Sequence, residues 1–296
     1  MDTYKSFEKL ELRDDYMFNL VMQDSELCKE CLERILDIKI DHIKYPESQK
    51  NITQTLLSKS VRLDIYTVGD GVVYDIEMQT ETRPELPKRS RYYQSAIDIN
   101  NLDKGDDYKK LKQSVVIFIC TFDEFDRGRH KYTFENKCIE EPDLVLNDGT
   151  KKVFLNTKGI LNDISPKLSN FLEYIGTGIV RDEYTEKLSE AVETKKNDER
   201  LRGEYMTLIT RITEAEARGE ARGEARGEAK AKAEMVWAMY KNDVDIFTIC
   251  KCSELSDKVV LDIIRSHQKA FNETIDPDLI DEMAADSVED REKIKP

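Results

Sequence analysis

The feature that most constrains this chain is residues 61–79, which have the pattern of a tight β-hairpin. Two runs rich in β-branched, aromatic and aliphatic residues flank Asp70-Gly71, a dipeptide typical of two-residue type I′ turns. If these two residues form the turn, stepping outward along both strands brings Asp64 opposite Glu77. The sequence therefore predicts two antiparallel strands in a fixed register.

This register sorts the hairpin side chains onto two faces. Ile65 and Ile76 share an apolar face that belongs to a core. Asp64 and Glu77 share the polar face, with Cβ atoms about 4.5–5.5 Å apart, so their charges repel. A divalent cation between them would offset this repulsion, since Mg²⁺ commonly binds one or two carboxylates together with waters and substrate phosphates. The alternative is that Arg62 neutralises the pair on a solvated face.

Several short motifs in and around the hairpin stand in an order shared with a known family. They are Asp15-Tyr16-Met17-Phe18, Asp64, Glu77-Met78-Gln79, Arg89 followed by Tyr93, and Gly105 with Tyr108. In these residues the chain resembles the PD-(D/E)XK nuclease superfamily, and most closely its Rpn-like branch of recombination-promoting nucleases and transposases. The resemblance covers about residues 10 to 175.

The resemblance implies a restriction-endonuclease-like α/β (α+β) fold, with an αβββαβ core, a mixed sheet flanked by helices and a C-terminal helical extension. It also implies that Asp64 and Glu77 hold Mg²⁺ or Mn²⁺ and that Gln79 positions the attacking water. Many superfamily members carry lysine at the position of Gln79, whereas glutamine is usual in this branch. Asp15 is a further candidate metal ligand, although helix capping also explains an acid at its position.

A local basic patch follows the hairpin. Lys88, Arg89 and Arg91 are interleaved with tyrosines in a predicted helix that begins at about Lys88. Arg89 and Tyr93 are four residues apart and share a face, where arginine would bind phosphate and tyrosine would hydrogen-bond it or stack on a base. The alternative is an ordinary amphipathic helix with solvated arginines. The family match favours substrate binding by Lys88, Arg89, Arg91 and Tyr93.

The overall charge limits the kinds of partner. The 296 residues include 46 Lys and Arg against 60 Asp and Glu, a net charge of −14, which argues against coating nucleic acid by bulk electrostatics. No apolar run approaches the roughly 20 residues that cross a bilayer. The first residues also lack the apolar core of a signal peptide, so we expect a cytoplasmic protein that does not bind membranes.

Periodicity and turn residues predict the remaining elements. We expect helices over residues 14–36 and 163–175, the second ending at Gly176, a central strand over 114–122, and further strands over 39–45, 129–139, 143–146 and 151–155, the last two joined at Asp148-Gly149.

Four regions follow from these patterns. Residues 1–185 form the nuclease-like domain, and residues 186–234 form a charged spacer, helical or flexible, with three Ala-Arg-Gly-Glu repeats. Residues 235–272 form a small helical domain for oligomerisation or of helix-turn-helix type. Residues 273–296 form an acidic tail that we expect to be disordered.

The CxxC spacing of Cys28 and Cys31 would suit zinc, with Cys250 and Cys252 completing the site. We discount zinc, because Cys28 and Cys31 lie in an amphipathic helical pattern where buried thiols act as small hydrophobic side chains. The function favoured by the sequence is a metal-dependent DNA endonuclease. The alternatives are a nuclease-derived fold that only binds nucleic acid or protein, and a nuclease that cleaves RNA.

Overall fold

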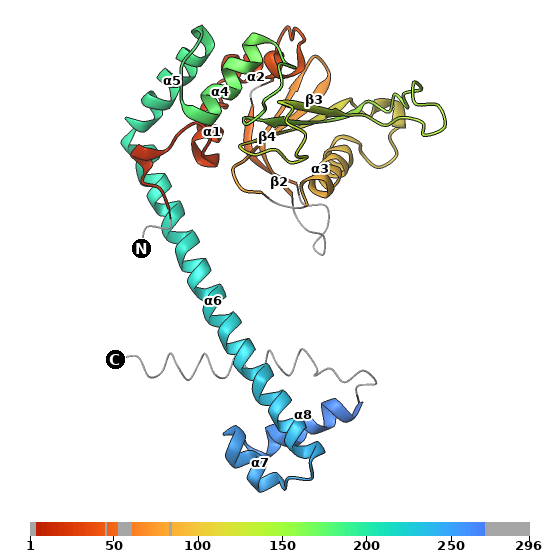
Figure 1. Cartoon of the computed structure of the whole chain (residues 1–296), viewed down its shortest axis with the longest axis vertical. Helices are drawn as coiled ribbons and strands as arrows, with labels where there is room; N and C mark the ends of the chain where they lie inside the picture. Colours follow the sequence, from red (N-terminus) through yellow and green to blue (C-terminus); the bar gives the residue numbers. More distant parts are fainter. Residues whose placement is uncertain (1–3, 45, 53–60, 83–84, 270–296) are drawn as a thin grey trace. The chain divides into compact units, whose positions relative to one another are not determined.

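A computed structural model describes residues 4–44, 46–52, 61–82 and 85–269. In chain order these residues form η1 Phe7–Lys9, α1 Asp15–Val21, α2 Ser25–Leu36, β1 Glu47–Ile52, β2 Val61–Gly69, β3 Val72–Gln79, α3 Leu86–Asn101, η2 Tyr108–Lys110, β4 Ser114–Cys120, β5 Lys131–Phe134, β6 Thr150–Asn156, α4 Pro166–Thr177, α5 Glu183–Lys196, α6 Glu199–Lys241, α7 Ile246–Ser253 and α8 Asp257–Lys269 (Figure 1). The predicted acidic tail and the side chain of Arg62 lie outside the described residues.

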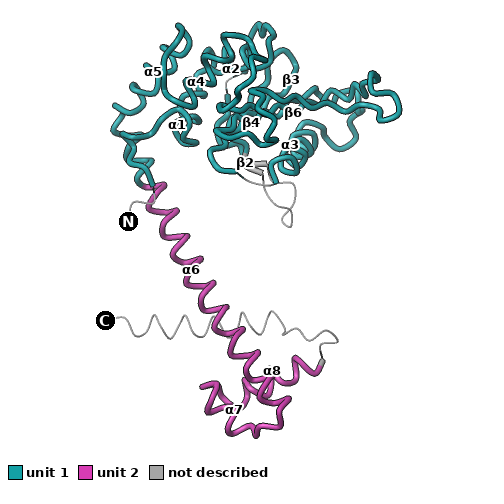
Figure 2. Tube along the Cα trace, in the orientation of Figure 1, with its two compact units in different colours: residues 1–206 teal, residues 207–296 magenta. Residues whose placement is uncertain are grey.

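The chain divides into two compact units (Figure 2). Unit 1 comprises residues 1–206 and contains the sheet, whereas unit 2 comprises residues 207–296 and contains most of α6 together with α7 and α8. None of the helices in the described part combines the length and the apolar character that a membrane span requires.

The sheet of unit 1 has six strands in the order β1-β2-β3-β4-β6-β5. β1, β2 and β3 pair antiparallel, β3, β4 and β6 pair parallel, and β5 pairs antiparallel with β6. Figure 1 shows α3 against one face and α1, α2, α4 and α5 grouped on the other side. The predicted α/β fold with a mixed sheet is confirmed.

The hairpin of β2 and β3 has the predicted register. Ile65 pairs with Ile76, and Tyr66 pairs with Asp75. Asp70 and Gly71 both have positive φ, at 47° and 83°, which a type I′ turn requires at both central positions.

The predicted central strand is also confirmed, because all seven residues of β4 are buried. On the α3 side of the sheet, Val73, Val116 and Phe118 pack against Leu86 and Ile97 of α3. The other side holds α2, whose Cys28 and Cys31 are completely buried as predicted. Burial raises the pKa of Cys31 to about 12.

The predicted single helix over residues 14–36 is wrong, because the chain breaks after Val21 and restarts at Ser25. The side chain of Asp24 accepts hydrogen bonds from the backbone N–H groups of Glu26 and Leu27 and caps α2. Asp24 is a helix-start signal that lies inside an otherwise continuous apolar periodicity.

The predicted strand over residues 39–45 is also wrong among its described residues. Only Ile43 makes a β-bridge, to Gly69, while Ile40 and Ile43 both pack over Gly69, close to where a Cβ would stand. These isoleucines are three residues apart, so they do not follow the two-residue period of a strand. The edge strand is instead β1, which begins directly after Pro46.

The region after β5 differs from its prediction as well. Residues 143–146 form no strand, although Val145 makes one bridge to Lys137. β6 pairs with β4 and β5 instead, so Asp148-Gly149 is not a hairpin turn. The buried side chains of Val153 and Leu155 explain this choice, because burial against a central strand outweighs a local turn signal.

α4 runs to Thr177, one residue beyond the predicted end at Gly176. Its C-cap is Gly178, with φ of 76°, whose N–H bonds the carbonyl of Tyr174. A left-handed glycine just after the helix satisfies its last carbonyl groups.

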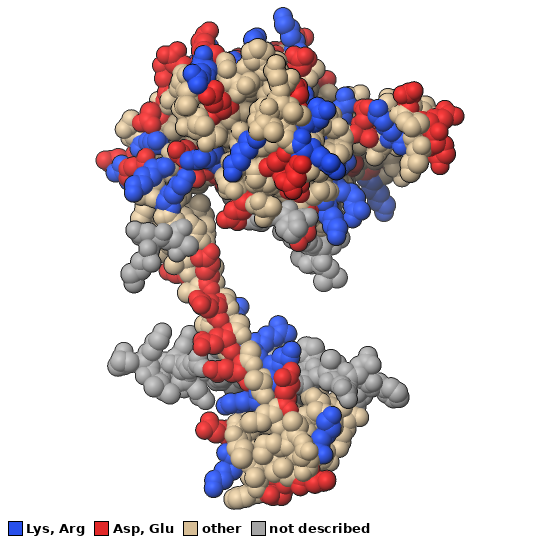
Figure 3. All heavy atoms as spheres, in the orientation of Figure 1, with Lys and Arg blue, Asp and Glu red and all other residues tan. Residues whose placement is uncertain are grey.

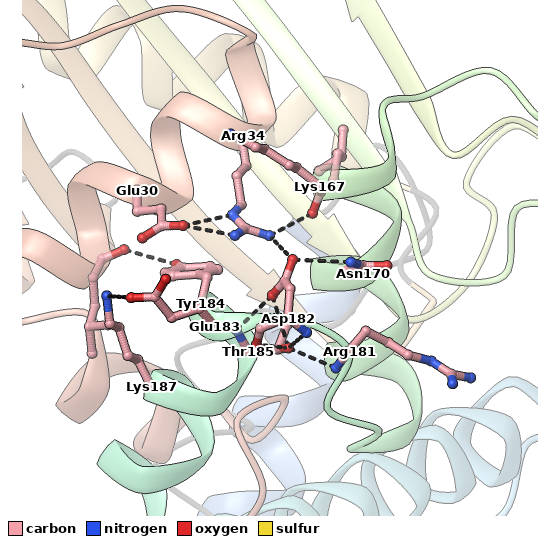
Figure 4. Close-up of polar contacts among 12 residues, drawn as sticks. Glu30, Arg34, Lys167, Asn170, Arg181, Asp182, Glu183, Tyr184, Thr185 and Lys187 are labelled. Atoms are coloured by element: carbon pink, nitrogen blue, oxygen red, sulfur yellow. Dashed lines mark hydrogen bonds and ion pairs between the residues drawn. The ribbon is translucent and has the colours of Figure 1, made fainter.

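An ion cluster centred on a buried arginine joins α2 to the segment between α4 and α5 (Figure 4). Arg34 has a side chain only 7% exposed, and it donates to Asp182 at 2.7 Å and to Glu30 at 2.8 Å. It also lies over the Tyr184 ring, 4.4 Å from the centroid. Burial alone would raise the pKa of Asp182, but its hydrogen bonds, first that from Arg34, hold the pKa well below its usual range. The cluster holds these helices together.

Unit 2 has a small core of its own. Val236 of α6, Ile249 of α7 and Ile263 of α8 are completely buried in it. The rings of Trp237 and His267 pack in a tilted arrangement with centroids 4.6 Å apart. The charged repeats are helical, because α6 continues without a break from Glu199 to Lys241.

Candidate active site

The two acids of the hairpin meet where β2 and β3 separate. The ladder between these strands ends at the pair Ile65 and Ile76, one step before Asp64 and Glu77. There side chains replace the backbone ladder: the Asp64 N–H donates to Glu77 Oε1 at 2.9 Å, and the Met78 N–H donates to Asp64 Oδ2 at 3.2 Å. The two carboxylates are therefore held in place by reciprocal bonds to each other's strand.

Six of the eight candidate residues line one open cleft of about 290 Å³: Asp15, Asp64, Glu77, Gln79, Arg89 and Tyr93. Asp15 comes from the first turn of α1, and its carboxylate accepts a hydrogen bond from the Asn19 side chain at 2.7 Å. The remaining candidates, Lys88 and Arg91, are exposed on α3 and do not line the cleft.

Glu77 and Asp75 are buried acids beside the cleft. Glu77 is 1% exposed and Asp75 is completely buried, two residues earlier on the same face of β3. Burial, followed by the charge of Asp75, raises the pKa of Glu77 well above its usual range. Burial, followed by the charge of Asp64, does the same for Asp75. Among the described residues, no N–H group donates to either carboxylate oxygen of Asp75.

Among the described side chains, that of Arg89 contacts these acids. Arg89 Nη2 lies 3.6 Å from Glu77 Oε2 and donates to the Tyr93 hydroxyl at 2.6 Å, while Arg89 Nη1 donates to Gln79 Oε1 at 3.1 Å. Burial, followed by the charge of Glu77, raises the pKa of Tyr93 to about 12, so the hydroxyl keeps its proton. Because a guanidinium only donates, the oxygen of Gln79 must face Arg89, and its amide N–H₂ is left to donate elsewhere.

The two carboxylates are arranged to bind a divalent metal ion, which would offset the repulsion between them. Asp64 and Glu77 offer oxygen ligands at the cleft, and the described side chain of Arg89 lies beside them. Among the described residues, no group of three or more His, Cys, Asp or Glu side chains is arranged to hold a metal. Two carboxylates remain, which is the number Mg²⁺ commonly uses when waters and substrate phosphates complete its shell.

Sequence reasoning did not include Asp75 or Asn19 among the candidate site residues. The signal for Asp75 was its spacing, since Asp75, Glu77 and Gln79 alternate along one strand and share a face. The signal for Asn19 was its position four residues after Asp15, which places it one helical turn further on the same face.

The helix-flanked mixed sheet, with paired carboxylates at the open end of one hairpin, defines a nuclease-type α/β domain. A family model described as PD-(D/E)XK nuclease family transposase matches residues 12–242, and the chain belongs to this family. Nucleases of this superfamily generally use divalent metals. No curated protein and no solved structure matches the chain.

Proposed function

We propose that this protein is a metal-dependent endonuclease that hydrolyses phosphodiester bonds in DNA. The observation that carries this proposal is the reciprocal bonding of Asp64 and Glu77 in a cleft that also contains Arg89. Repelling acids are fixed there with an arginine beside them, which suits an ion and a phosphate together.

Asp64 and Glu77 would hold Mg²⁺ or Mn²⁺, with Asp15 as a further candidate ligand at the cleft rim. When bound, such an ion lowers the pKa of a coordinated water and neutralises charge on a phosphoryl oxygen. Gln79 holds the attacking water through its amide N–H₂, because its oxygen is occupied by Arg89. Arg89 and Tyr93 bind the scissile phosphate through their N–H and O–H donors.

Lys88 and Arg91 extend this interaction to the flanking DNA backbone. Both are exposed one turn or less from Arg89 on α3, where they can reach neighbouring phosphates. We also propose that the protein self-associates through its C-terminal helices.

The test is cleavage of supercoiled DNA, single-stranded DNA and RNA side by side, with Mg²⁺ or Mn²⁺ and with EDTA. We expect DNA cleavage that EDTA abolishes and that Asp64→Ala reduces at least 100-fold, since the variant loses one of two carboxylate ligands. Asp143→Ala, a change of an exposed acid outside the cleft, is the matched control and should cleave normally.

Three results would contradict the proposal in different ways. Binding without cleavage at any divalent metal supports the alternative of a nuclease-derived binding module. Cleavage of RNA alone changes the substrate and keeps the chemistry. Unchanged nicking by Asp64→Ala would show that the carboxylate of Asp64 has no role in cleavage.

A further inference from the structure

A second cavity of unit 1 opens on the α3 side of the sheet. Its volume is about 280 Å³, and three phenylalanines line it: Phe125 from the loop after β4, Phe134 of β5 and Phe154 of β6. Pro87 and Ser90 of α3 line it as well. Among the described residues, this cavity shares no lining residue with the active-site cleft. We call it the aromatic pocket.

The three rings of the aromatic pocket lie close together, and one of them is open to solvent. The ring centroid of Phe125 is 5.1 Å from that of Phe134 and 5.2 Å from that of Phe154. Phe154 is buried, whereas Phe134 is 44% exposed. A lone exposed aromatic residue is ordinary, but an exposed ring inside an aromatic cavity offers a surface on which another flat ring can stack.

The aromatic pocket and the cleft lie on opposite flanks of α3. Arg89 of this helix lines the cleft, and Pro87 lines the pocket. These residues are two positions apart, which is about 200° around the helix axis. A ligand that occupies both sites must therefore pass around α3.

A row of rings beneath α3 shows that the two sites are close. Tyr93 lines the cleft and stacks on the buried ring of Phe118, with centroids 6.1 Å apart. Phe118 stacks in turn on Phe154 of the aromatic pocket, with centroids 5.3 Å apart. Successive nucleotides of a stacked strand are about 3.4 Å apart along its axis. One strand can therefore reach both sites within a few nucleotides.

The outer surface of α3 between the two sites carries positive charge. Starting from Arg89 and turning outward, the helix presents Lys88 after about 100° and Arg91 after a further 60° or so, and then reaches Pro87. Lys88 and Arg91 are both exposed. Figure 3 shows Lys and Arg side chains over the part of unit 1 that contains α3. A nucleic-acid backbone that crosses α3 from the cleft to the pocket would contact both cations.

The lining of the aromatic pocket is different, because its charges are balanced. The described lining holds one acid, Glu135, and one base, Lys152. The carboxylate of Glu135 lies 3.6 Å from the ammonium group of Lys137. The pocket therefore suits an uncharged aromatic group, whereas the outer surface of α3 suits phosphates.

We propose that the aromatic pocket takes one unpaired nucleobase of a DNA strand whose scissile phosphate lies in the cleft. The backbone of that strand crosses α3 over Lys88 and Arg91, and the base stacks on Phe134. A base inside a fully paired duplex cannot enter such a pocket without leaving its stack. This proposal rests on the proposed nuclease function and adds to it that the preferred DNA has unpaired nucleotides beside the cleavage position.

The occupant is a base because stacking surface and phosphate contacts occur together here. Proteins that bind single strands combine a positively charged path for the backbone with aromatic side chains on which bases stack. An apolar side chain of a protein partner would fill the pocket but would make no use of the cations that lead to it.

The test measures binding of the full chain to labelled DNA by fluorescence anisotropy in EDTA, where no cleavage occurs. The DNA is a duplex interrupted by a short unpaired stretch of thymines, compared with the same duplex fully paired. A third DNA has abasic residues in place of the unpaired thymines, so it keeps the phosphates and loses the bases. We expect the wild-type chain to bind the thymine stretch about tenfold more tightly than the abasic stretch, because one base stacked on an aromatic side chain contributes about that much.

Phe134→Ala should weaken binding to the thymine stretch about tenfold and leave binding to the abasic stretch and to the paired duplex unchanged. The effects of removing the ring and removing the bases should thus not add, because both remove the same contact. Phe247→Ala, a change of a phenylalanine that is 80% exposed in unit 2, is the matched control and should bind all three DNAs like the wild type.

The proposal is overturned if the wild-type chain does not bind the thymine stretch more tightly than the abasic stretch, or if Phe134→Ala binds the thymine stretch like the wild type. The first comparison uses the unchanged chain, so it does not depend on how the variant folds. Cleavage without base-dependent binding would refute the pocket and keep the nuclease. Base-dependent binding without cleavage at any divalent metal would support the pocket and refute the nuclease.

Discussion

At the scale of single residues, Arg89 determines what Gln79 can do. Arg89 Nη1 donates to Gln79 Oε1 at 3.1 Å, which fixes the orientation of the amide and leaves N–H₂ as a donor in the cleft. Where the superfamily carries lysine, this chain therefore keeps a hydrogen-bond donor without a positive charge. Preorganised donors of this kind stabilise charge that develops in a transition state.

Substitutions of Gln79 test whether its amide N–H₂ acts as a hydrogen-bond donor in the cleft. Gln79→Glu keeps the shape and still accepts from Arg89, but it removes the donor, so the nicking rate at saturating metal should fall about 100-fold. Gln79→Lys retains a donor and should keep most of the rate. Single-turnover nicking of supercoiled DNA measures both, and equal rates for wild type and Gln79→Glu would show that the donor has no role.

Tyr93 and Arg89 also show how far residue spacing is informative. Their four-residue separation predicted a shared face, and the structure gives a hydrogen bond of 2.6 Å between them. Asp75 was harder to interpret, because its burial depends on the neighbouring parallel strand, where Val116 is its partner. That pairing joins residues far apart in sequence, and no local pattern of β3 indicates it.

At the scale of elements, strand pairing outweighed turn signals wherever the two disagreed. Asp70-Gly71 makes a hairpin because both flanking runs supply buried residues to one core. Asp148-Gly149 makes none, because β6 is bound on one side to β4 and on the other to β5. β1 has the polar sequence ESQKNI and is a strand because it satisfies the open edge of β2.

The Arg34 cluster connects elements that the sequence alone does not bring together. Asp182→Asn removes the charge facing the buried guanidinium of Arg34, so it should lower the free energy of unfolding by about 3 kcal/mol. Glu183→Gln, which changes an exposed pair with Lys187, should cost at most about 0.5 kcal/mol. Chemical denaturation at neutral pH measures both, and equal effects would contradict the structural role of Asp182.

The pH dependence of this effect has a definite sign. The folded state holds the pKa of Asp182 below its unfolded value of about 3.9, so the carboxylate contributes stability above that pH. The contribution disappears as pH falls toward the folded pKa. The difference between wild type and Asp182→Asn should therefore shrink below about pH 4.

At the scale of the whole molecule, net charge and local charge act in opposite directions. A chain of net charge −14 repels DNA overall, so the proposed DNA binding would depend on the few cations near the cleft. Lys88 and Arg91 are exposed on α3 close to Arg89, and together they are expected to make about two of the phosphate contacts.

Salt dependence measures that contribution. In EDTA, where no cleavage occurs, replacing both Lys88 and Arg91 with Ala should reduce the slope of log K against log salt concentration by about two. Replacing Lys251 and Lys258, which are exposed in unit 2, should leave the slope unchanged. A slope that stays the same in the α3 variant would place the DNA on another surface.

The sequence by itself determined the hairpin register, the buried central strand, the helix that carries Arg89 and Tyr93, and the helical C-terminal region. Each of these follows from interactions between residues close in the chain, namely turn geometry, side-chain alternation and helical periodicity. The two acids are consequently predictable as a facing pair.

Only the tertiary structure decided the break between α1 and α2, the strand β1, the partners of β6 and the burial of Asp75. In each case a group must satisfy its hydrogen bonds or bury its surface against an element distant in sequence. Local propensity contributes less free energy than such contacts. The tertiary contacts, and not the segment alone, therefore determine which secondary structure forms.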